Sequence, residues 1–280
     1  MAVKLLAFDL DGTAILNHRT LPEENRLALE SAAARGVLLV PATGRMLDFL
    51  PSSVTALPVS YAITANGGGV YRLPGREPVI QNLIPNDKAL EIQRVLGDYD
   101  VYIEYYSNGK AITRRDMPPR ARTHYALPQS KWGFVDGKDY TLVESLSHML
   151  EETGLRPEKI NLPYLKDGLK AEVRARLEAL GGLRLTSSIS DNLEINSAQA
   201  HKGGALLALA RVLGLRREDL MAIGDNGNDL TMLEAAGCSV AVEDGSPEAL
   251  AAAKHRTAPH DQNGLARAVE RFVLGNGTDA

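Results

Sequence analysis

The sequence predicts an α/β protein: a Rossmann-like, doubly wound parallel-sheet core into which an α+β domain is inserted. Short apolar runs alternate with helical patterns before residue 65 and again from residue 193, which is typical of βαβ units. Between these stretches, Ser107-Asn108-Gly109 separates two strand-like runs and indicates an antiparallel hairpin. At 280 residues the chain is long enough for one large or two modest domains.

The composition is that of an ordinary globular protein and narrows the class of partner. A net charge of −4 argues against nucleic acid or an anionic membrane as the main partner. The single cysteine, Cys238, excludes an internal disulfide framework and fits a reducing compartment. Asp9 interrupts the N-terminal apolar run before it reaches the length of a signal peptide, and no window is apolar enough for a membrane span. We therefore expect a cytoplasmic protein.

The first predicted element is a buried strand over Val3–Phe8, which continues into Asp9-Leu10-Asp11-Gly12-Thr13. Carboxylates at positions i and i+2 project to the same side of a strand end, where they repel one another unless a cation lies between them. Two oxygen ligands at this spacing suit Mg²⁺. Gly12 permits a tight turn out of the sheet. The alternative is an acidic turn without chemistry.

The next two strands also end in loops that could approach a ligand. A helix is predicted from Thr20, as N-cap, to Arg35, followed by a strand over Val37–Val40. Thr43 and Gly44 then suit an anion-binding loop, or an ordinary β–α turn.

The third strand, Tyr61–Thr64, ends at a glycine-rich segment. Asn66 and Gly67 lie in this segment, which allows close approach of the backbone to a ligand or makes a flexible turn. Val70–Arg72 and Pro78–Gln81 are predicted to form a small hairpin.

An inserted α+β module is predicted over residues 83–190. Its expected helices cover residues 87–96, 140–152 and 167–180, and its expected strands cover residues 101–106, 110–115, 159–164 and 183–186. Residues 1–82 and 191–280 are then the core domain.

The parallel pattern is predicted to resume at Leu193–Asn196. A helix over His201–Leu213 follows, with Lys202 at its start, and then a strand over Met221–Ile223 that leads to an acidic loop. The remaining elements are expected as a helix over 230–235, a strand over 239–242, and helices from about 246 and 264.

Several polar residues share one position, after a strand and before a helix. They are Asp9 and Asp11, Thr43, and the group Asp225, Asn228 and Asp229; Lys202 must instead reach in from the start of a helix. The carboxyl ends of parallel strands face one crevice, where ligands bind. Carboxylates there can hold a divalent cation, and a hydroxyl with an ammonium can hold an anion. This set of side chains predicts a site for a metal and a phosphate.

The segments FDLDGT, TGR, a lone lysine and GDNGNDLTML resemble, in this order, the four motifs of the haloacid dehalogenase superfamily of phosphohydrolases. The insert resembles the C2 cap of the Cof-type (class IIB) sugar-phosphatase branch. ITANGGG and LEINSAQAHKGGAL are similar to that branch as well. The resemblance covers both core segments, and across the insert it rests on the arrangement alone.

The resemblance implies a role for each matching residue. Asp9 would be the nucleophile that forms an aspartyl-phosphate, and Asp11 the general acid and base. Mg²⁺ would be held by Asp9, Asp11 (through its backbone carbonyl) and Asp225. The phosphoryl group would be bound by Thr43, Gly44, Lys202 and Asn228. Asp229, Asn66 and Gly67 would support the site, Asp229 by orienting Lys202.

Three functions remain open at this level. The first is Mg²⁺-dependent hydrolysis of small phosphate monoesters, with sugar phosphates as the expected class. The second is phosphoryl transfer between positions of a sugar, as in phosphomutases, and the third is phosphate sensing without catalysis, which an intact Asp9 disfavours. Selection of the substrate is expected from the insert, acting as a lid. Asp244 lies in an acidic turn that departs from the family pattern and receives no role.

Overall fold

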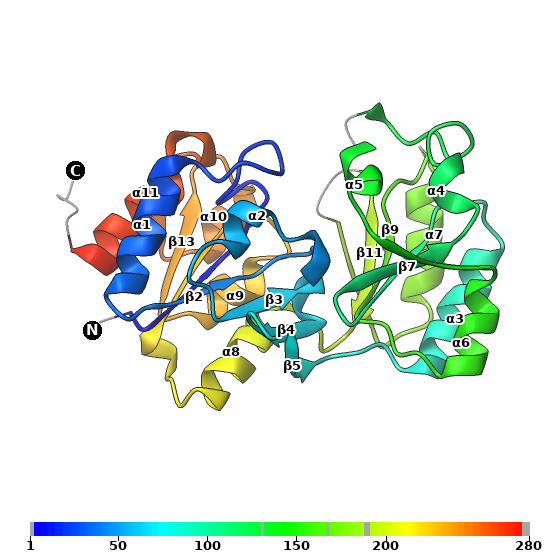
Figure 1. Ribbon diagram of the computed structural model, residues 1–280, viewed down its shortest axis with the longest axis horizontal. Coiled ribbons are helices and arrows are strands. Elements are labelled where there is room, and N and C mark those ends of the chain that lie inside the picture. Colours follow the sequence, from blue (N-terminus) through cyan, green and yellow to red (C-terminus); the bar gives the residue numbers. More distant parts are fainter. Residues whose placement is uncertain (1–2, 130–131, 167, 188–190, 276–280) are drawn as a thin grey trace. The chain divides into compact units, whose positions relative to one another are not determined.

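The computed structural model describes residues 3–129, 132–166, 168–187 and 191–275, and the chain divides into two compact units (Figure 1). The core unit comprises Met1–Gly44, Leu50–Ile80 and His201–Ala280. The inserted unit comprises Arg45–Phe49 and Gln81–Ala200.

The core unit is built on a parallel sheet with the strand order β14-β13-β12-β1-β2. Its strands are β1 (Leu5–Phe8), β2 (Leu38–Pro41), β12 (Leu220–Gly224), β13 (Cys238–Val242) and β14 (His255–Thr257). A parallel bridge between Ala42 and Ile63 places β3 (Tyr61–Thr64) beside β2, and β3 continues into the antiparallel strands β4 (Gly69–Arg72) and β5 (Glu77–Gln81). The predicted α/β class and the small hairpin are confirmed.

Helices cover both faces of this sheet, because successive side chains of its buried strands point to opposite sides. Leu5 and Ala7 of β1 pack with α8 (Lys202–Val212) and α9 (Leu230–Ala235). On the other face, α1 (Glu23–Ala34) and α11 (Gly264–Val269) lie side by side (Figure 1). The remaining helical segments are α2 (Ser52–Thr55), α10 (Pro247–Ala252), the short 3₁₀ segments η2 (Ala65–Gly67), η4 (Arg217–Asp219) and η5 (His260–Gln262), and η6 (Glu270–Leu274), a π-helix.

The start of the first helix differs from the prediction. Helix α1 begins at Glu23 with Pro22 in the N-cap position and no side-chain cap. Thr20 lies in a backbone ladder instead: Leu16 N donates to Thr20 O at 2.7 Å, and Thr20 N donates to Leu16 O at 2.9 Å. The prediction that Thr20 is the N-cap is wrong, because an extended pairing holds it upstream of the first turn.

The inserted unit has a six-stranded sheet with the order β10-β11-β9-β6-β7-β8. Its strands are β6 (Glu104–Ser107), β7 (Lys110–Arg114), β8 (Tyr140–Val143), β9 (Lys159–Leu162), β10 (Leu183–Thr186) and β11 (Leu193–Ser197). All neighbours are antiparallel except β7 and β8. The predicted hairpin is confirmed, since Ser107 pairs with Lys110 across Asn108 and Gly109, both at positive φ.

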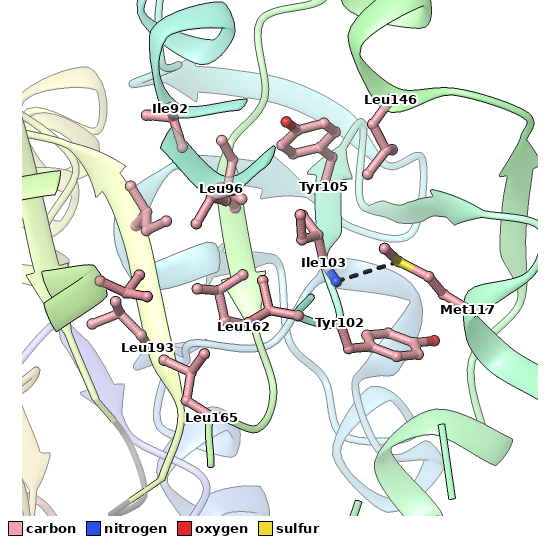
Figure 2. Close-up of a cluster of buried hydrophobic side chains, with 14 of the residues drawn as sticks. Ile92, Leu96, Tyr102, Ile103, Tyr105, Met117, Leu146, Leu162, Leu165 and Leu193 are labelled. Carbon is pink, nitrogen blue, oxygen red and sulfur yellow. Dashed lines mark hydrogen bonds between the residues drawn. The ribbon is translucent and has the colours of Figure 1, made fainter. Parts of the chain in front are cut away.

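Three helices, α3 (Asn86–Gly97), α6 (Leu146–Thr153) and α7 (Leu169–Glu178), pack on one face of the inserted sheet around an apolar cluster (Figure 2). Ile92 and Leu96 of α3 belong to this cluster together with Leu162 of β9 (Figure 2). In the same cluster the backbone N–H of Ile103 donates to the Met117 sulfur at 3.5 Å. The shorter segments are η1 (Leu47–Phe49), α4 (Met117–Arg120) and α5 (Trp132–Asp136).

The predicted helix over residues 140–152 is wrong in its first part. Tyr140–Val143 is a strand that pairs with β7, and α6 begins only at Leu146. The Ser145 hydroxyl accepts a hydrogen bond from His148 N and caps the helix there. An aromatic and β-branched run next to a sheet edge is better satisfied by pairing than by a helix.

The predicted return to the parallel sheet at Leu193 is also wrong. Strand β11 pairs antiparallel with β9 and β10, and the inserted unit extends to Ala200. Its apolar residues Leu193 and Ile195 face the cluster of Figure 2, while Glu194 alternates with them. This alternation is typical of antiparallel strands, whereas buried parallel strands are apolar throughout. The predicted C-terminal boundary of the insert, residue 190, is one of residues 188–190, which lie outside the described residues.

Among the residues that the structure describes, no helix is long and apolar enough to cross a membrane.

Candidate active site

The parallel strands of the core unit deliver several of the predicted residues to one edge of the sheet. Phe8, the last residue of β1, pairs with Ile223 of β12 and with Pro41 of β2. Backbone hydrogen bonds continue beyond the ladder, from Asp9 N to Ile223 O at 3.0 Å and from Ala42 N to Phe8 O at 2.8 Å. The segments that contain Asp9, Thr43 and Asp225 therefore leave neighbouring strands at the same edge.

The loop after β3 joins this edge through the backbone of Thr43. Thr43 N donates to Ile63 O at 2.9 Å, and Thr43 O accepts from Asn66 N at 3.0 Å. The Thr43 side chain is buried, and Gly44 follows it at the end of the core segment.

Lys202, the first residue of α8, brings its side chain to the same edge of the sheet from the start of a helix. His201 caps the helix, its Nδ1 accepting from Gly204 N at 2.9 Å. The fully buried Lys202 Nζ donates to Asp9 Oδ1 and to Asp229 Oδ1, each at 2.6 Å. An ammonium group between two carboxylates satisfies the buried charge on both sides.

Asp229 also organises the loop that follows β12. Its Oδ2 accepts from the backbone N–H groups of Asp225 at 3.0 Å and Asn226 at 3.1 Å. Asp225 Oδ1 in turn accepts from Thr13 Oγ1 at 2.9 Å. Gly12, at φ +83°, lies against Asp225, so that a Cβ there would be 2.7 Å from Oδ2. Only glycine allows this approach.

Three carboxylates gather at this edge with an excess of negative charge. Asp9, Asp225 and Asp229 each offer an oxygen within 4.8 Å of the others. Burial, reinforced by Asp229, Asp225 and Asp11 and opposed by Lys202, raises the pKa of Asp9 well above its usual value. Burial and the charge of Asp229 likewise raise the pKa of Asp225 to about 6.

The pKa of Lys202 shifts in the direction that favours its charged form. Burial alone would lower the pKa of Lys202, but the charges of Asp229 and Asp9 outweigh burial and raise it. The site thus contains one ammonium group and three carboxylates, and each carboxylate offers oxygen atoms as ligands. This donor set and charge excess fit a divalent cation such as Mg²⁺.

The remaining predicted residues border this cluster. Asn228 Nδ2 donates to Asn66 Oδ1 at 3.3 Å, and Asn66 is in the left-handed region at φ 58°. Gly67, at φ +96°, approaches the chain before α8 so closely that a Cβ would lie 2.6 Å from His201 O. Asn66, Gly67 and Asn228 are therefore brought together beside the start of the helix that presents Lys202.

Asp11 takes a different position from the one expected for a member of the carboxylate cluster. Its side chain is not one of the three that gather within 4.8 Å among the described residues. Asp11 Oδ1 instead lies 2.7 Å from His18 Nδ1. Neither His18 nor Thr13 was expected from the sequence at this site. The signal for Thr13 was available, since it lies within the DGT motif, but His18 is in an exposed loop without a motif.

Asp244 receives a structural role. Its Oδ1 accepts from the backbone N–H of His260 at 2.9 Å, and its other carboxylate oxygen contacts His260 Nδ1. The next residues brace the acidic loop, because Ser246 N donates to Asp225 O at 2.7 Å. Asp244, His260 and Asp261 form a second, more exposed group of side chains that could ligate a metal.

Comparison with known proteins identifies the family of this chain. The family model of the haloacid dehalogenase-like hydrolases matches residues 6–269. YxeH of Bacillus subtilis (strain 168) is 30% identical over 278 residues, which cover 97% of this chain and 98% of that protein. The 5-amino-6-(5-phospho-D-ribitylamino)uracil phosphatase YwtE of the same organism is 27% identical over 292 residues, covering 98% of this chain and 99% of that protein.

The solved structure of BT4131, a sugar phosphatase of subclass IIB, has the same fold. The TM-score is 0.77 at 22% identity, with coverage of 96% of this chain and 99% of that one. With the family match spanning nearly the whole chain, we conclude that this protein belongs to the haloacid dehalogenase-like hydrolases and is a phosphatase.

Proposed function

We propose that the protein is a Mg²⁺-dependent phosphohydrolase that cleaves small phosphate monoesters, with sugar phosphates as the substrate class, through an aspartyl-phosphate intermediate. The observation on which the proposal rests is the buried carboxylate of Asp9, held by Lys202 at 2.6 Å beside the carboxylates of Asp225 and Asp229. A single carboxylate would not be enough, since phosphate monoesters are among the slowest substrates to hydrolyse unaided.

Asp9 is proposed as the nucleophile. Its oxygen attacks phosphorus while the P–O bond to the leaving alcohol breaks, and the electron pair of that bond moves to the ester oxygen. The anionic Asp9 and the phosphate repel each other, and the ammonium of Lys202 offsets part of this repulsion. Asp9, Asp225 and the backbone carbonyl of Asp11 would hold Mg²⁺, which when bound supplies further positive charge at the phosphate.

Other residues would position the phosphoryl group and the machinery. Thr43, Gly44 and Asn228 are proposed to bind phosphoryl oxygens together with Lys202. Asp229 would support the site, because its two oxygens bind Lys202 and the backbone of the Asp225 loop. Asn66 and Gly67 would support it from the loop after β3.

Asp11 is proposed as the general acid and base. In the first step its proton would pass to the ester oxygen as the alcohol leaves. In the second step the same carboxylate would accept a proton from the water that attacks the aspartyl-phosphate. Both transfers require the Asp11 carboxyl group to lie within hydrogen-bond reach of the reacting oxygen.

The inserted unit is proposed as the cap that selects the substrate. One face of its sheet carries polar and charged side chains in cross-strand register, among them the buried residues Glu104, Lys159, Asn161 and Glu194. Asn161 Nδ2 donates to Glu104 at 2.8 Å, and Lys159 Nζ donates to Glu194 at 2.7 Å. Such groups can hydrogen bond the hydroxyls of a sugar or sugar alcohol. The named substrate of YwtE, a phosphorylated ribityl compound, supports the same class.

We also propose the cytoplasm as the protein's location, on the grounds of its single cysteine.

The test is a panel of phosphorylated metabolites, including sugar phosphates and 5-amino-6-(5-phospho-D-ribitylamino)uracil, assayed for phosphate release with and without Mg²⁺. We expect release to require Mg²⁺ and to stop in excess chelator. Asp9→Asn should lower the rate on every ester by more than about 10⁴-fold, as loss of a nucleophile does in other enzymes. The matched control is Asp261→Asn, an exposed aspartate of the second acidic group, which should keep full activity.

Two results would contradict the proposal in different ways. Undiminished turnover in excess chelator would remove the metal from the mechanism. Conversion of a sugar phosphate to a positional isomer without release of phosphate would identify phosphoryl transfer in place of hydrolysis.

A further inference from the structure

A tight turn follows the first strand and returns the chain toward Asp11. Leu16 and Thr20 exchange backbone hydrogen bonds of 2.7 and 2.9 Å, and Arg19 N donates to Leu16 O at 3.0 Å. The two central residues, Asn17 at φ 49° and His18 at φ 59°, are both left-handed. Positive φ at both central residues is typical of a type I′ turn over residues 16–19, which here lies within a three-residue loop between the paired Leu16 and Thr20.

The turn favours glycine at its second central position, and histidine is among the non-glycine residues that adopt a left-handed backbone more often than most. Asn-Gly is the favoured pair for this geometry, since glycine adopts a left-handed backbone at no steric cost and other side chains do so at a cost. When a non-glycine residue is observed in the left-handed region, a functional reason for it can be sought. At His18 a side-chain contact accompanies the unfavourable backbone, because its Nδ1 lies 2.7 Å from Asp11 Oδ1.

The backbone supports this contact from the other side of the turn. A parallel bridge joins Asp11 to Ile15, so the chain that enters the turn runs beside Asp11. The side chain of Asp11 is 28% exposed and that of His18 is 48% exposed. Burial alone therefore does not fix the Asp11 carboxyl group, and a hydrogen bond from a neighbouring element restrains its rotation.

We propose that His18 is a positioning residue that holds the Asp11 carboxyl group in the orientation required for proton transfer to the leaving alcohol. The inference rests on the proposed function, in which the proton of Asp11 passes to the ester oxygen as Asp9 bonds to phosphorus. A ring nitrogen and a carboxyl group form this hydrogen bond whichever of them holds the proton, so the restraint does not depend on the titration of His18. Misplacement of a reacting group by about 1 Å can cost about 100-fold in rate.

Two substitutions at His18 distinguish the effect of its imidazole group from the effect of the turn backbone. His18→Gly removes the side chain and favours the left-handed backbone, so the turn is preserved or improved. His18→Asn also tolerates this backbone, and its amide nitrogen occupies the position of Nδ1, from which it can donate to Asp11. Arg19→Ala, in the same turn and with an exposed side chain, is the matched control.

The measurement is the single-turnover rate of ester cleavage with Mg²⁺, on a sugar phosphate and on p-nitrophenyl phosphate. Protonation matters for a sugar alkoxide and little for p-nitrophenolate, which departs as a stable anion. We expect His18→Gly to slow the sugar phosphate by about 10- to 100-fold and p-nitrophenyl phosphate much less. His18→Asn should recover most of the loss, and Asp11→Ala should show the same contrast with a larger magnitude. Thermal unfolding of each variant checks that the fold is intact.

The outcomes are separable. Equal losses on the two esters in His18→Gly, or no recovery in His18→Asn, would overturn the inference while leaving the proposed function in place. A wild-type protein that cleaves neither these esters nor any member of the metabolite panel would overturn the proposed function, and the role of His18 with it.

Discussion

The site contains three carboxylates and one ammonium group, and this imbalance links the stability of the protein to pH. The pKa of Asp225 is raised from 3.8 to about 6, chiefly by burial and then by Asp229. Between these two values the folded state binds a proton that the unfolded state has released. The free energy of unfolding of the metal-free protein therefore falls as the pH rises through this window. The raised pKa of Asp9 acts in the same direction.

Asp225→Asn is predicted to stabilise the metal-free protein at pH 7.5 and to leave it nearly unchanged at pH 4. The gain arises because the amide keeps an acceptor for Thr13 but has no charge to repel Asp229. A shift of this size corresponds to at most about 3 kcal/mol, less any screening by solvent. Urea unfolding in excess chelator at both pH values measures it.

Added Mg²⁺ is expected to stabilise the wild type at pH 7.5, and the same variant should lose this stabilisation. Asp261→Asn again serves as the control and should retain it. A metal-free Asp225→Asn protein that is less stable than the wild type at pH 7.5 would show that repulsion does not dominate at this residue.

At the scale of elements, Lys202 depends on how closely α8 packs on α9. Gly203 N donates to Thr231 Oγ1 at 3.1 Å, and a Cβ on Gly203 would lie 2.0 Å from Thr231 O. No side chain fits at that distance without a shift of one helix. Because Lys202 is on α8 and Asp229 immediately precedes α9, a shift would change the distance between their charged groups.

Gly203→Ala is predicted to destabilise the protein by about 1–3 kcal/mol, as overpacking of a close contact does, and to lower kcat. Gly97→Ala in α3 is the matched control, since nothing lies within 4 Å of a Cβ there. Alanine should be neutral or slightly stabilising at that helical position. Urea unfolding and phosphate release are measured on both, and a Gly203→Ala protein as stable and active as the control would contradict the prediction.

At the scale of the whole molecule, the position of β11 decides where the insert can be removed. Among the described residues, the strand partners of β11 are β9 and β10 of the inserted unit, although β11 follows the segment predicted as the end of the insert. Removal of residues 83–190 would therefore leave Leu193–Ser197 without partners. Its apolar residues and open backbone groups would then be exposed, which favours aggregation.

We predict that replacing Gln81–Ala200 by a short Gly-Ser linker gives a core that unfolds cooperatively, whereas replacing residues 83–190 gives an aggregating protein. Size-exclusion chromatography and thermal unfolding followed by circular dichroism distinguish the two. If the protein without residues 83–190 were monomeric and unfolded cooperatively as well, β11 would not require its antiparallel partners. A folded core should also lose its discrimination among phosphate esters, as expected if the insert is the cap.

Much of the core unit could be predicted because its signals are local. The apolar run of Leu5–Phe8 followed by Asp9 and Asp11, and the run before Asp225, each indicate a buried strand and a polar loop within a few residues. The rule that parallel strands end at one edge then brings Asp9 and Asp225 together. Helix α9 and strand β3 also have the predicted bounds.

Three features could not be predicted in the same way. They are the sheet to which β11 belongs, the strand at Tyr140–Val143, and the contact between Asp11 and His18. By itself the sequence determined the α/β class, the order of the motifs and the acidic residues that gather at the strand ends, because side-chain periodicity and strand-to-loop transitions are local properties. Only the tertiary structure decided which sheet a strand joins and which side chain meets Asp11. Strand partners are determined by hydrogen bonds and apolar contacts between segments that are distant in the sequence. The contact of His18 with Asp11 depends on the backbone angles of a turn, which no sequence motif predicts.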